Sequence, residues 1–153
     1  MATNGASRIG RRAAIVGGLR TPFVKAGGDF RDLSAVDLGA ILVNELVART
    51  GIPAREYDAV IFGQVIPSQL ATLIGREVVL RTQLPKSVQA YTVSRACATS
   101  IQAATDAADQ IALGNADVVL AGGAESLSDA PIFASRPLAQ ALVTASRAKS
   151  PVA

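Results

Sequence analysis

Four short apolar runs alternate with segments of helical periodicity along this chain, and this alternation constrains the fold more than any other feature. The runs predict strands at residues 12–17, 59–65, 89–93 and 116–121. Helices are expected between Ser34 and Gly51, from about Leu70 to Arg81, between Cys97 and Gly114, and from Leu138 to about Arg147. Strands that alternate with helices indicate βαβ units. The predicted fold is therefore α/β, a mostly parallel sheet with helices on both faces.

The first predicted helix carries clear start and stop signals. Ser34 can cap its beginning, and Asp37 stands three residues later in the position of a capping box. Glu45 and Arg49 are four residues apart, which places them side by side on the solvent face. Gly51 then ends the helix.

The charge pattern argues against nucleic-acid binding and the hydropathy against a membrane span. The 15 basic residues exceed the 12 acidic ones by three, and Arg8, Arg11 and Arg12, in an acid-free N-terminal segment, account for that excess. The rest of the chain is neutral and offers no basic footprint for a phosphate backbone. No apolar run approaches the roughly 18 residues that suggest a membrane span.

The N-terminal segment and the cysteine content bear on location. Residues 1–11 are polar and acid-free, which predicts a flexible tail, with a short mitochondrial targeting segment as the alternative. The sequence has one cysteine, so it can form no internal disulfide. This suits a reducing compartment and favours a cytoplasmic location, or a mitochondrial one in a eukaryote.

Cys97 is the candidate catalytic residue. It lies between the strand predicted at 89–93 and the following helix, in the stretch Ser94-Arg95-Ala96-Cys97-Ala98-Thr99-Ser100. Strand, sharp turn, nucleophile and helix N-terminus resemble a nucleophile elbow, and the N–H groups of a helix N-terminus stabilise a thiolate. The alternative is a buried small hydrophobic residue, which is the usual role of a lone cysteine in an alanine-rich segment.

Five motifs, in order, resemble those of the thiolase family. They are AAIVGGLRTPF at 13–23, DLG at 37–39, VIFGQV at 60–65, SRACATSIQA at 94–103 and AGGAESLS at 121–128. The variant around Cys97 is most similar to the β-subunit branch of the fatty-acid oxidation complexes. After the tail at 1–11, the resemblance implies an incomplete thiolase N-terminal half-domain at 12–130 and the start of the loop-domain insertion at 131–153.

The resemblance also implies a reaction. Cys97 would accept an acyl group from a 3-ketoacyl-CoA, releasing acetyl-CoA, and coenzyme A would then take up the shortened acyl chain. The reverse condensation would use the same acyl-cysteine. Coenzyme A is expected as a co-substrate, with no permanently bound cofactor and no metal. Expected partners are acyl-CoA substrates, a second copy of the chain and a hydratase/dehydrogenase subunit.

Acid–base residues for such a reaction are missing from this sequence. It contains no histidine, the commonest general base near neutral pH, and no second cysteine, whereas the family uses both. We therefore expect a fragment that is inactive by itself. A catalytically inactive, thiolase-like interaction module is the alternative from another class of protein. A ketoacyl-synthase-like condensing enzyme fits the motifs at 20–23 and 94–100 less well.

Four further residues allow a functional and a structural interpretation. Arg20 could bind a phosphate or tie its own loop together. Glu125 could pair with a base or anchor the Gly-Gly loop through backbone N–H groups. Arg76 and Arg95 could line a subunit interface or remain solvated.

Overall fold

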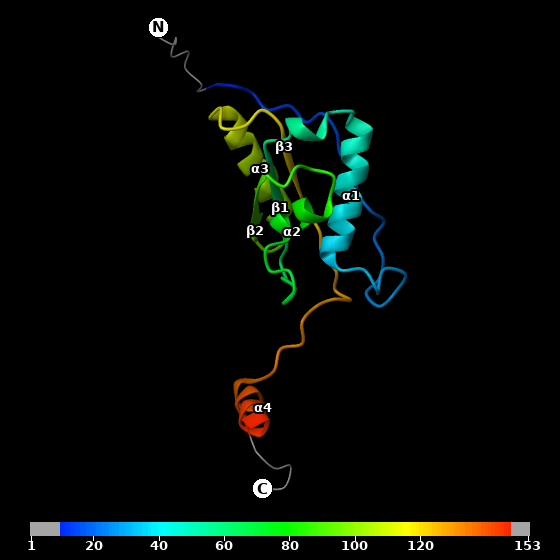
Figure 1. Cartoon of the computed structure of the whole chain (residues 1–153), viewed down its shortest axis with the longest axis vertical. Helices are drawn as coiled ribbons and strands as arrows, with labels where there is room; N and C mark the ends of the chain where they lie inside the picture. The colour runs from blue at the N-terminus through cyan, green and yellow to red at the C-terminus, as the bar shows by residue number, and fades with distance from the viewer. Residues whose placement is uncertain (1–9, 148–153) are drawn as a thin grey trace.

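The computed structural model describes residues 10–147, which contain three strands, four α-helices and one short 3-10 helix (Figure 1). In chain order these are α1 (Ala35–Thr50), η1 (Ala54–Glu56), β1 (Ala59–Gly63), α2 (Ile74–Arg81), β2 (Gln89–Val93), α3 (Thr99–Ala112), β3 (Val119–Gly123) and α4 (Arg136–Arg147). None of the helices within these residues is long and apolar enough to cross a membrane.

The three strands form one parallel sheet in the order β2-β1-β3. Their register is in step, because Gly63, the last residue of β1, lies opposite Val93 of β2 and Gly123 of β3. The carboxyl ends of all three strands therefore meet at one edge of the sheet, where reactive groups of open α/β sheets gather.

Helices cover both faces of the sheet, as predicted. On one face Val60 and Phe62 of β1 contribute to a core with buried residues of α1 and α2. On the other face Ile61 packs against Ala103 and Ala107 of α3. Successive side chains of a strand point to opposite faces, so a strand covered on both sides is apolar throughout. All five residues of β1 are accordingly buried.

Helix α1 begins and ends where its local sequence signals predict. The Ser34 hydroxyl accepts a hydrogen bond from the Asp37 N–H, and the Asp37 carboxylate accepts one from the Ser34 N–H, which completes the capping box. Glu45 and Arg49 form an ion pair at 2.6 Å. Gly51 ends the helix in the left-handed conformation, with a φ of 67°.

The prediction of a strand at residues 12–17 is wrong. This segment has no regular secondary structure, and the side chains of Ile15 and Val16 are 96% and 76% exposed. A strand needs a neighbour that pairs with its N–H and C=O groups, and in the described residues this segment pairs with neither edge strand of the sheet, β2 or β3. Within residues 10–147 no strand pairs with the segment; Arg11 instead forms an ion pair with Asp117.

Several predicted boundaries shift by a few residues. The second strand ends at Gly63 instead of residue 65, α2 begins at Ile74 instead of residue 70, and β3 covers 119–123 instead of 116–121. The start of α2 is set by contacts with β2, since the Gly75 N–H donates to Thr92 Oγ1 at 3.0 Å. Boundaries that depend on such contacts are poorly marked in a local sequence pattern.

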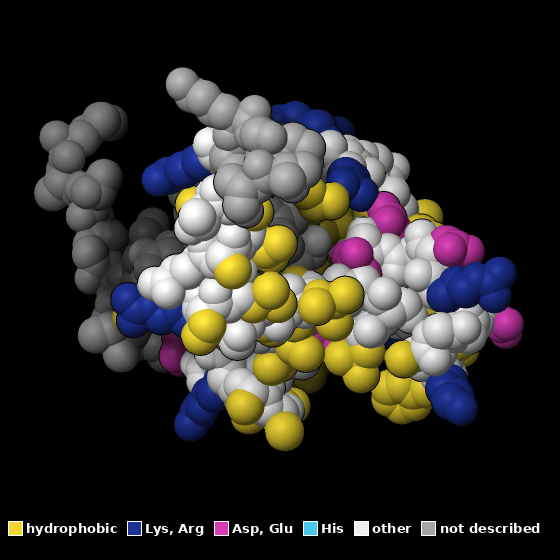
Figure 2. Space-filling view, turned by 90° about the horizontal axis from the view of Figure 1, so that it is seen from below, with side chains coloured by type: hydrophobic (Ala, Val, Ile, Leu, Met, Phe, Trp, Pro, Cys, Tyr) yellow, Lys and Arg dark blue, Asp and Glu magenta, His cyan; other side chains and the backbone are white. Residues whose placement is uncertain are grey.

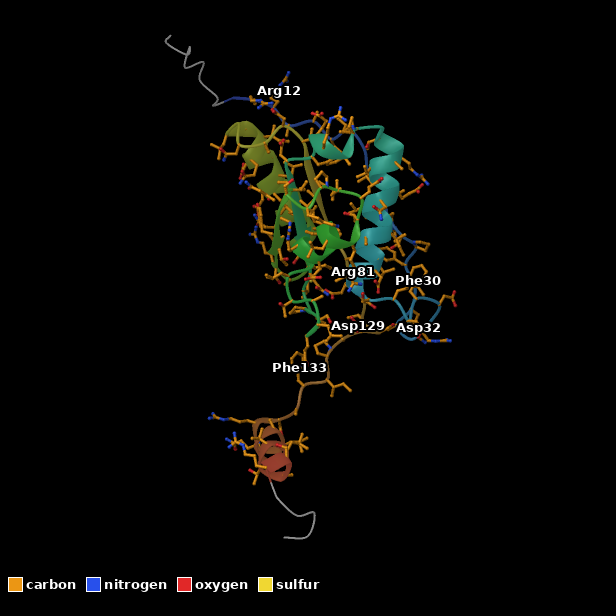
Figure 3. The ribbon with its side chains drawn as sticks, viewed as in Figure 1. Arg12, Phe30, Asp32, Arg81, Asp129 and Phe133 are labelled. Atoms are coloured by element: carbon orange, nitrogen blue, oxygen red, sulfur yellow. The ribbon has the colours of Figure 1, made fainter. Side chains whose placement is uncertain are left out.

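Helix α4 lies apart from the α/β body (Figure 1). Phe133 lies on the extended segment that joins the two (Figure 3), and its side chain is 80% exposed. Leu138, Leu142 and Val143 of α4 are also exposed. The predicted tail at 1–11 and the end of the predicted insertion at 131–153 fall partly outside the described residues.

Candidate functional site

A cavity of about 400 Å³ opens at the carboxyl edge of the sheet. Its lining comes from three places that are distant in sequence: residues 63–66 after β1, residues 96–100 around the start of α3, and residues 123–127 after β3. Cys97 is among the lining residues, and its side chain is exposed. The alternative interpretation, a cysteine buried in the core, does not fit this position.

The turn that carries Cys97 has an unusual backbone conformation. Ala96 has a φ of 44°, and no other non-glycine residue in the described part of the chain has a positive φ. A residue with a Cβ is disfavoured in this left-handed region, so neighbouring groups must hold it there. Sharp, strained turns of this kind project a nucleophile from the end of a strand.

Thr99 is bonded to this turn on both sides of Ala96. Its hydroxyl accepts a hydrogen bond from the Arg95 N–H at 2.7 Å and donates one to the Ala96 carbonyl at 2.7 Å. Thr99 is also the first residue of α3 and is only 5% exposed. The sequence interpretation overlooked Thr99, although it lies within the motif around Cys97.

Two glycines allow the three segments to approach closely. A Cβ at Gly63 would lie 2.3 Å from Thr99 Cγ2, and a Cβ at Gly123 would lie 2.7 Å from Ser100 Oγ and 2.8 Å from the Gly63 carbonyl oxygen. Real Cβ contacts are longer than this. Gly63 at the end of a buried apolar run, and Gly123 at the end of β3, are therefore needed to bring α3 against the sheet.

Glu125 anchors the segment that follows β1. Its carboxylate accepts hydrogen bonds from the N–H groups of Val65 and Ile66 at 2.8 and 3.2 Å, and from Gln64 Nε2 at 3.5 Å. This supports the anchoring role over pairing with a base. Gln64 is 6% exposed, and its Oε1 has no hydrogen-bond partner among the described residues.

A second cavity, of about 490 Å³, adjoins the first and shares Glu125 with it. It lies between the loop at residues 19–26, the first turns of α1 and the segment after β3. The guanidinium of Arg20 stacks over the Phe23 ring at 3.8 Å, and its Nε donates to the Thr21 carbonyl. Arg20 is thus engaged with its own loop, as in the structural interpretation.

The two other arginines also make contacts within the chain. Arg76 donates to the carbonyls of Lys86 and Val88, which fastens α2 to the loop before β2. Arg95 donates to Gln102 of α3. Both contacts are structural, and they leave the predicted interface role untested.

Shifted pKa values occur away from the Cys97 cavity. Hydrogen bonds from the N–H groups of Val118 and Asp117 lower the pKa of Asp58. Hydrogen bonds from Ser34, with a further contribution from Arg81, lower the pKa of Asp37. Burial, and then the charge of Asp106, raise the pKa of Tyr91. None of these groups lines the Cys97 cavity.

The fold is that of an α/β protein, and its exposed cysteine lies on a strained turn between a parallel strand and a helix, in the geometry of an elbow. The family model for "Thiolase, N-terminal domain" matches residues 13–151. The chain belongs to the thiolase family, and the resemblance seen in its motifs is confirmed.

Relatives and solved structures agree with this family. The chain is 48% identical over 144 residues to proteins named 3-ketoacyl-CoA thiolase from Yersinia pestis (strain Pestoides F) and Yersinia pseudotuberculosis (strain YPIII), and the match covers 94% of this chain. It spans 33% of the length of these relatives. The fold matches a Bacillus anthracis acetyl-CoA acetyltransferase with a TM-score of 0.81 and 32% identity, over 86% of this chain and 33% of that one. It also matches the Ascaris suum Acat5 thiolase in complex with coenzyme A, with a TM-score of 0.74 and 33% identity, over 77% of this chain and 31% of that one.

Proposed function

We propose that this chain supplies the acyl-accepting cysteine of a 3-ketoacyl-CoA thiolase. The observation that carries the proposal is the position of Cys97, which is exposed in a cavity at the carboxyl edge of the sheet. Relatives named 3-ketoacyl-CoA thiolase and a structural neighbour bound to coenzyme A support this substrate class.

The proposed reaction is a double acyl transfer. The Cys97 thiolate attacks C3 of the 3-ketoacyl-CoA, and the bond between C2 and C3 breaks. Its electron pair passes to C2, which takes up a proton to give acetyl-CoA, while the shortened acyl group remains on Cys97 as a thioester. The thiolate of coenzyme A then attacks this thioester and releases Cys97. A thioester is formed from a ketone and passed to another thiol, chemistry for which a thiolate nucleophile is well suited.

In this proposal the chain supplies the nucleophile, but its sequence contains no histidine for the proton steps. One acid must protonate C2, and one base must deprotonate coenzyme A. In this proposal, residues beyond this sequence, which spans a third of its relatives' length, supply them. The absence of histidine favours a second candidate, a thiolase-like interaction module without activity of its own.

Partners and domain limits belong to the same proposal. Residues 131–153 would begin the loop-domain insertion, and a second copy and a hydratase/dehydrogenase subunit would assemble with the protein. The exposed apolar side chains of α4 support a role in contacting further protein. A cytoplasmic location is proposed from the single cysteine, which suits a reducing compartment.

Alkylation and acylation of Cys97 test the proposed function. Cys97 is expected to react with iodoacetamide at pH 7 faster than free cysteine does, and to form an acyl-enzyme with acetyl-CoA that mass spectrometry locates on its peptide. Cys97→Ala is the control and should give neither product. A rate no faster than that of free cysteine would count against an activated nucleophile. Thiolysis of acetoacetyl-CoA by this chain alone would rule out the inactive module.

A further inference from the structure

The conformation of Ala96 decides where Cys97 points. The peptide group between residues 96 and 97 links the two, so its orientation sets the direction of the Cys97 side chain. Ala96 holds a φ of 44°, a region that alanine leaves unless neighbouring groups oppose it. Some group must therefore stabilise this turn in the conformation that exposes Cys97 to the cavity.

We propose that Thr99 is this group, a positioning residue that holds Ala96 left-handed and thereby directs Cys97 into the cavity. The inference rests on the proposed role of Cys97 as nucleophile. A hydroxyl can donate and accept at the same time. The Thr99 hydroxyl does both, accepting from the Arg95 N–H and donating to the Ala96 carbonyl. These two bonds hold the peptide group between residues 94 and 95 and the peptide group between residues 96 and 97, so they restrain the backbone on both sides of Ala96.

The Thr99 side chain is itself held in place. It is 95% buried, and its Cγ2 methyl lies against Gly63, where no side chain competes for the space. A β-branched side chain has few rotamers, so a fixed methyl also fixes the hydroxyl. The close packing of α3 on β1 therefore also fixes the hydroxyl that bonds to the turn carrying Cys97.

A simpler role for Thr99 would be to cap α3, and the hydrogen bonds argue against it. A capping hydroxyl accepts from N–H groups two or three residues ahead of it. The N-cap residue of α3 is Ala98, and no side chain caps this helix. Both bonds of the Thr99 hydroxyl run backward to the turn, so the hydroxyl stabilises the turn instead of the helix.

The test is the alkylation rate of Cys97 in variants of the whole protein. Thr99→Val keeps the methyl against Gly63 but loses both hydrogen bonds, and we expect the iodoacetamide rate to fall about tenfold. Thr99→Ser keeps the hydroxyl but loses the methyl that fixes its rotamer, so its rate should fall by only about twofold. Thr105→Val is the matched control, because Thr105 donates only to helix carbonyls on an exposed face, and it should also stay within about twofold.

A second arm tests the left-handed conformation directly. Glycine adopts a positive φ without strain, so Ala96→Gly should restore most of the rate in the Thr99→Val background. Should Thr99→Val not fold, as judged by circular dichroism, the double variant replaces it and is compared with Ala96→Gly alone. An alkylation rate of the double variant within about threefold of the Ala96→Gly rate supports the proposal. A larger deficit overturns it.

Other outcomes overturn the inference while leaving the proposed function intact. A purely structural role would lower the urea midpoint of Thr99→Val without slowing alkylation. An equal loss of alkylation rate in Thr99→Ser and Thr99→Val would also contradict the inference. So would an alkylation rate that Ala96→Gly does not restore in the Thr99→Val background. These rates are compared between variants, so the comparison remains valid even if wild-type Cys97 reacts no faster than free cysteine. That wild-type result would count against the proposed function alone.

Discussion

The Cγ2 methyl of Thr99 occupies the space that a side chain at Gly63 would need, since a Cβ there would lie only 2.3 Å away. Gly63 ends the central strand, and Thr99 begins the helix that follows Cys97. The turn that carries Cys97 therefore packs directly against the end of β1. A residue larger than glycine at position 63 would displace the start of α3.

Gly63→Ala is expected to lower the free energy of unfolding by about 1–3 kcal/mol, because the added methyl overpacks this contact. Thr99→Ser removes the opposing methyl, so the double variant should recover part of the loss. Urea denaturation of the four proteins in the cycle measures the coupling. Gly18→Ala is the control, since a Cβ there meets nothing within 4 Å. Additive effects of the two substitutions would contradict the proposed contact.

Asp58 fastens the start of β3 through two backbone N–H groups, those of Val118 at 3.0 Å and Asp117 at 2.7 Å. These bonds favour the carboxylate and lower the pKa of Asp58. Because the pKa is lower in the folded protein, the unfolded chain binds more protons in acid. The contribution of Asp58 to stability is therefore present above about pH 4 and is lost as the pH falls through the lower folded value.

Asp58→Asn should accordingly destabilise the protein at pH 7. The difference in unfolding temperature between this variant and wild type should narrow as the pH is lowered below about 4. Thermal unfolding at a series of pH values gives the comparison. Asp29→Asn, an exposed carboxylate on the loop before α1, is the control and should show no such trend. A difference that stayed constant down to acidic pH would mean that the charge of Asp58 is not involved.

Glu125 joins the segment after β3 to the segment after β1, 60 residues earlier in the chain. Glu125→Ala leaves the N–H groups of Val65 and Ile66 without this acceptor, and should lower the free energy of unfolding by about 1 kcal/mol. Glu125→Gln keeps one acceptor oxygen and should lose less. Equal stability of all three proteins in urea denaturation would show that the carboxylate does not hold this segment.

Large apolar side chains remain exposed on this chain, among them Ile15, Phe23, Leu70 and Ile132, each at least 94% accessible. In the view from below, hydrophobic side chains cover broad areas of the surface (Figure 2). Such patches favour association in water. We expect the isolated chain to elute as an oligomer or an aggregate in size-exclusion chromatography coupled to light scattering. A monodisperse monomer that melts cooperatively would refute this expectation.

Much of the fold could be predicted from the sequence where short-range patterns are sufficient. The capping box of Ser34 and Asp37 and the pair of Glu45 and Arg49 join residues three and four positions apart. The apolar run of β1 marks a strand covered on both faces. The position of Cys97 between a strand and a helix, and the similarity of its motif to the thiolases, identify it as the candidate from the sequence alone.

The segment at 12–17 shows where such patterns fail. Its apolar residues predict a buried strand, yet Ile15 and Val16 are exposed. Hydrophobicity favours burial but does not say which neighbour will provide the hydrogen-bond partners that a strand requires. That depends on which strand edge the segment reaches in the folded chain, and among residues 10–147 it pairs with neither edge strand, β2 or β3.

The sequence alone determined the alternation of helices and strands from α1 to α4, the ends of α1 and the choice of Cys97 as candidate, because these follow from residues close together in the chain. Only the tertiary structure decided that Thr99 seats against Gly63 and that Glu125 holds Val65 and Ile66. Those contacts join residues between 36 and 60 positions apart. Their formation depends on the parallel register, which brings the carboxyl ends of the three strands to one edge.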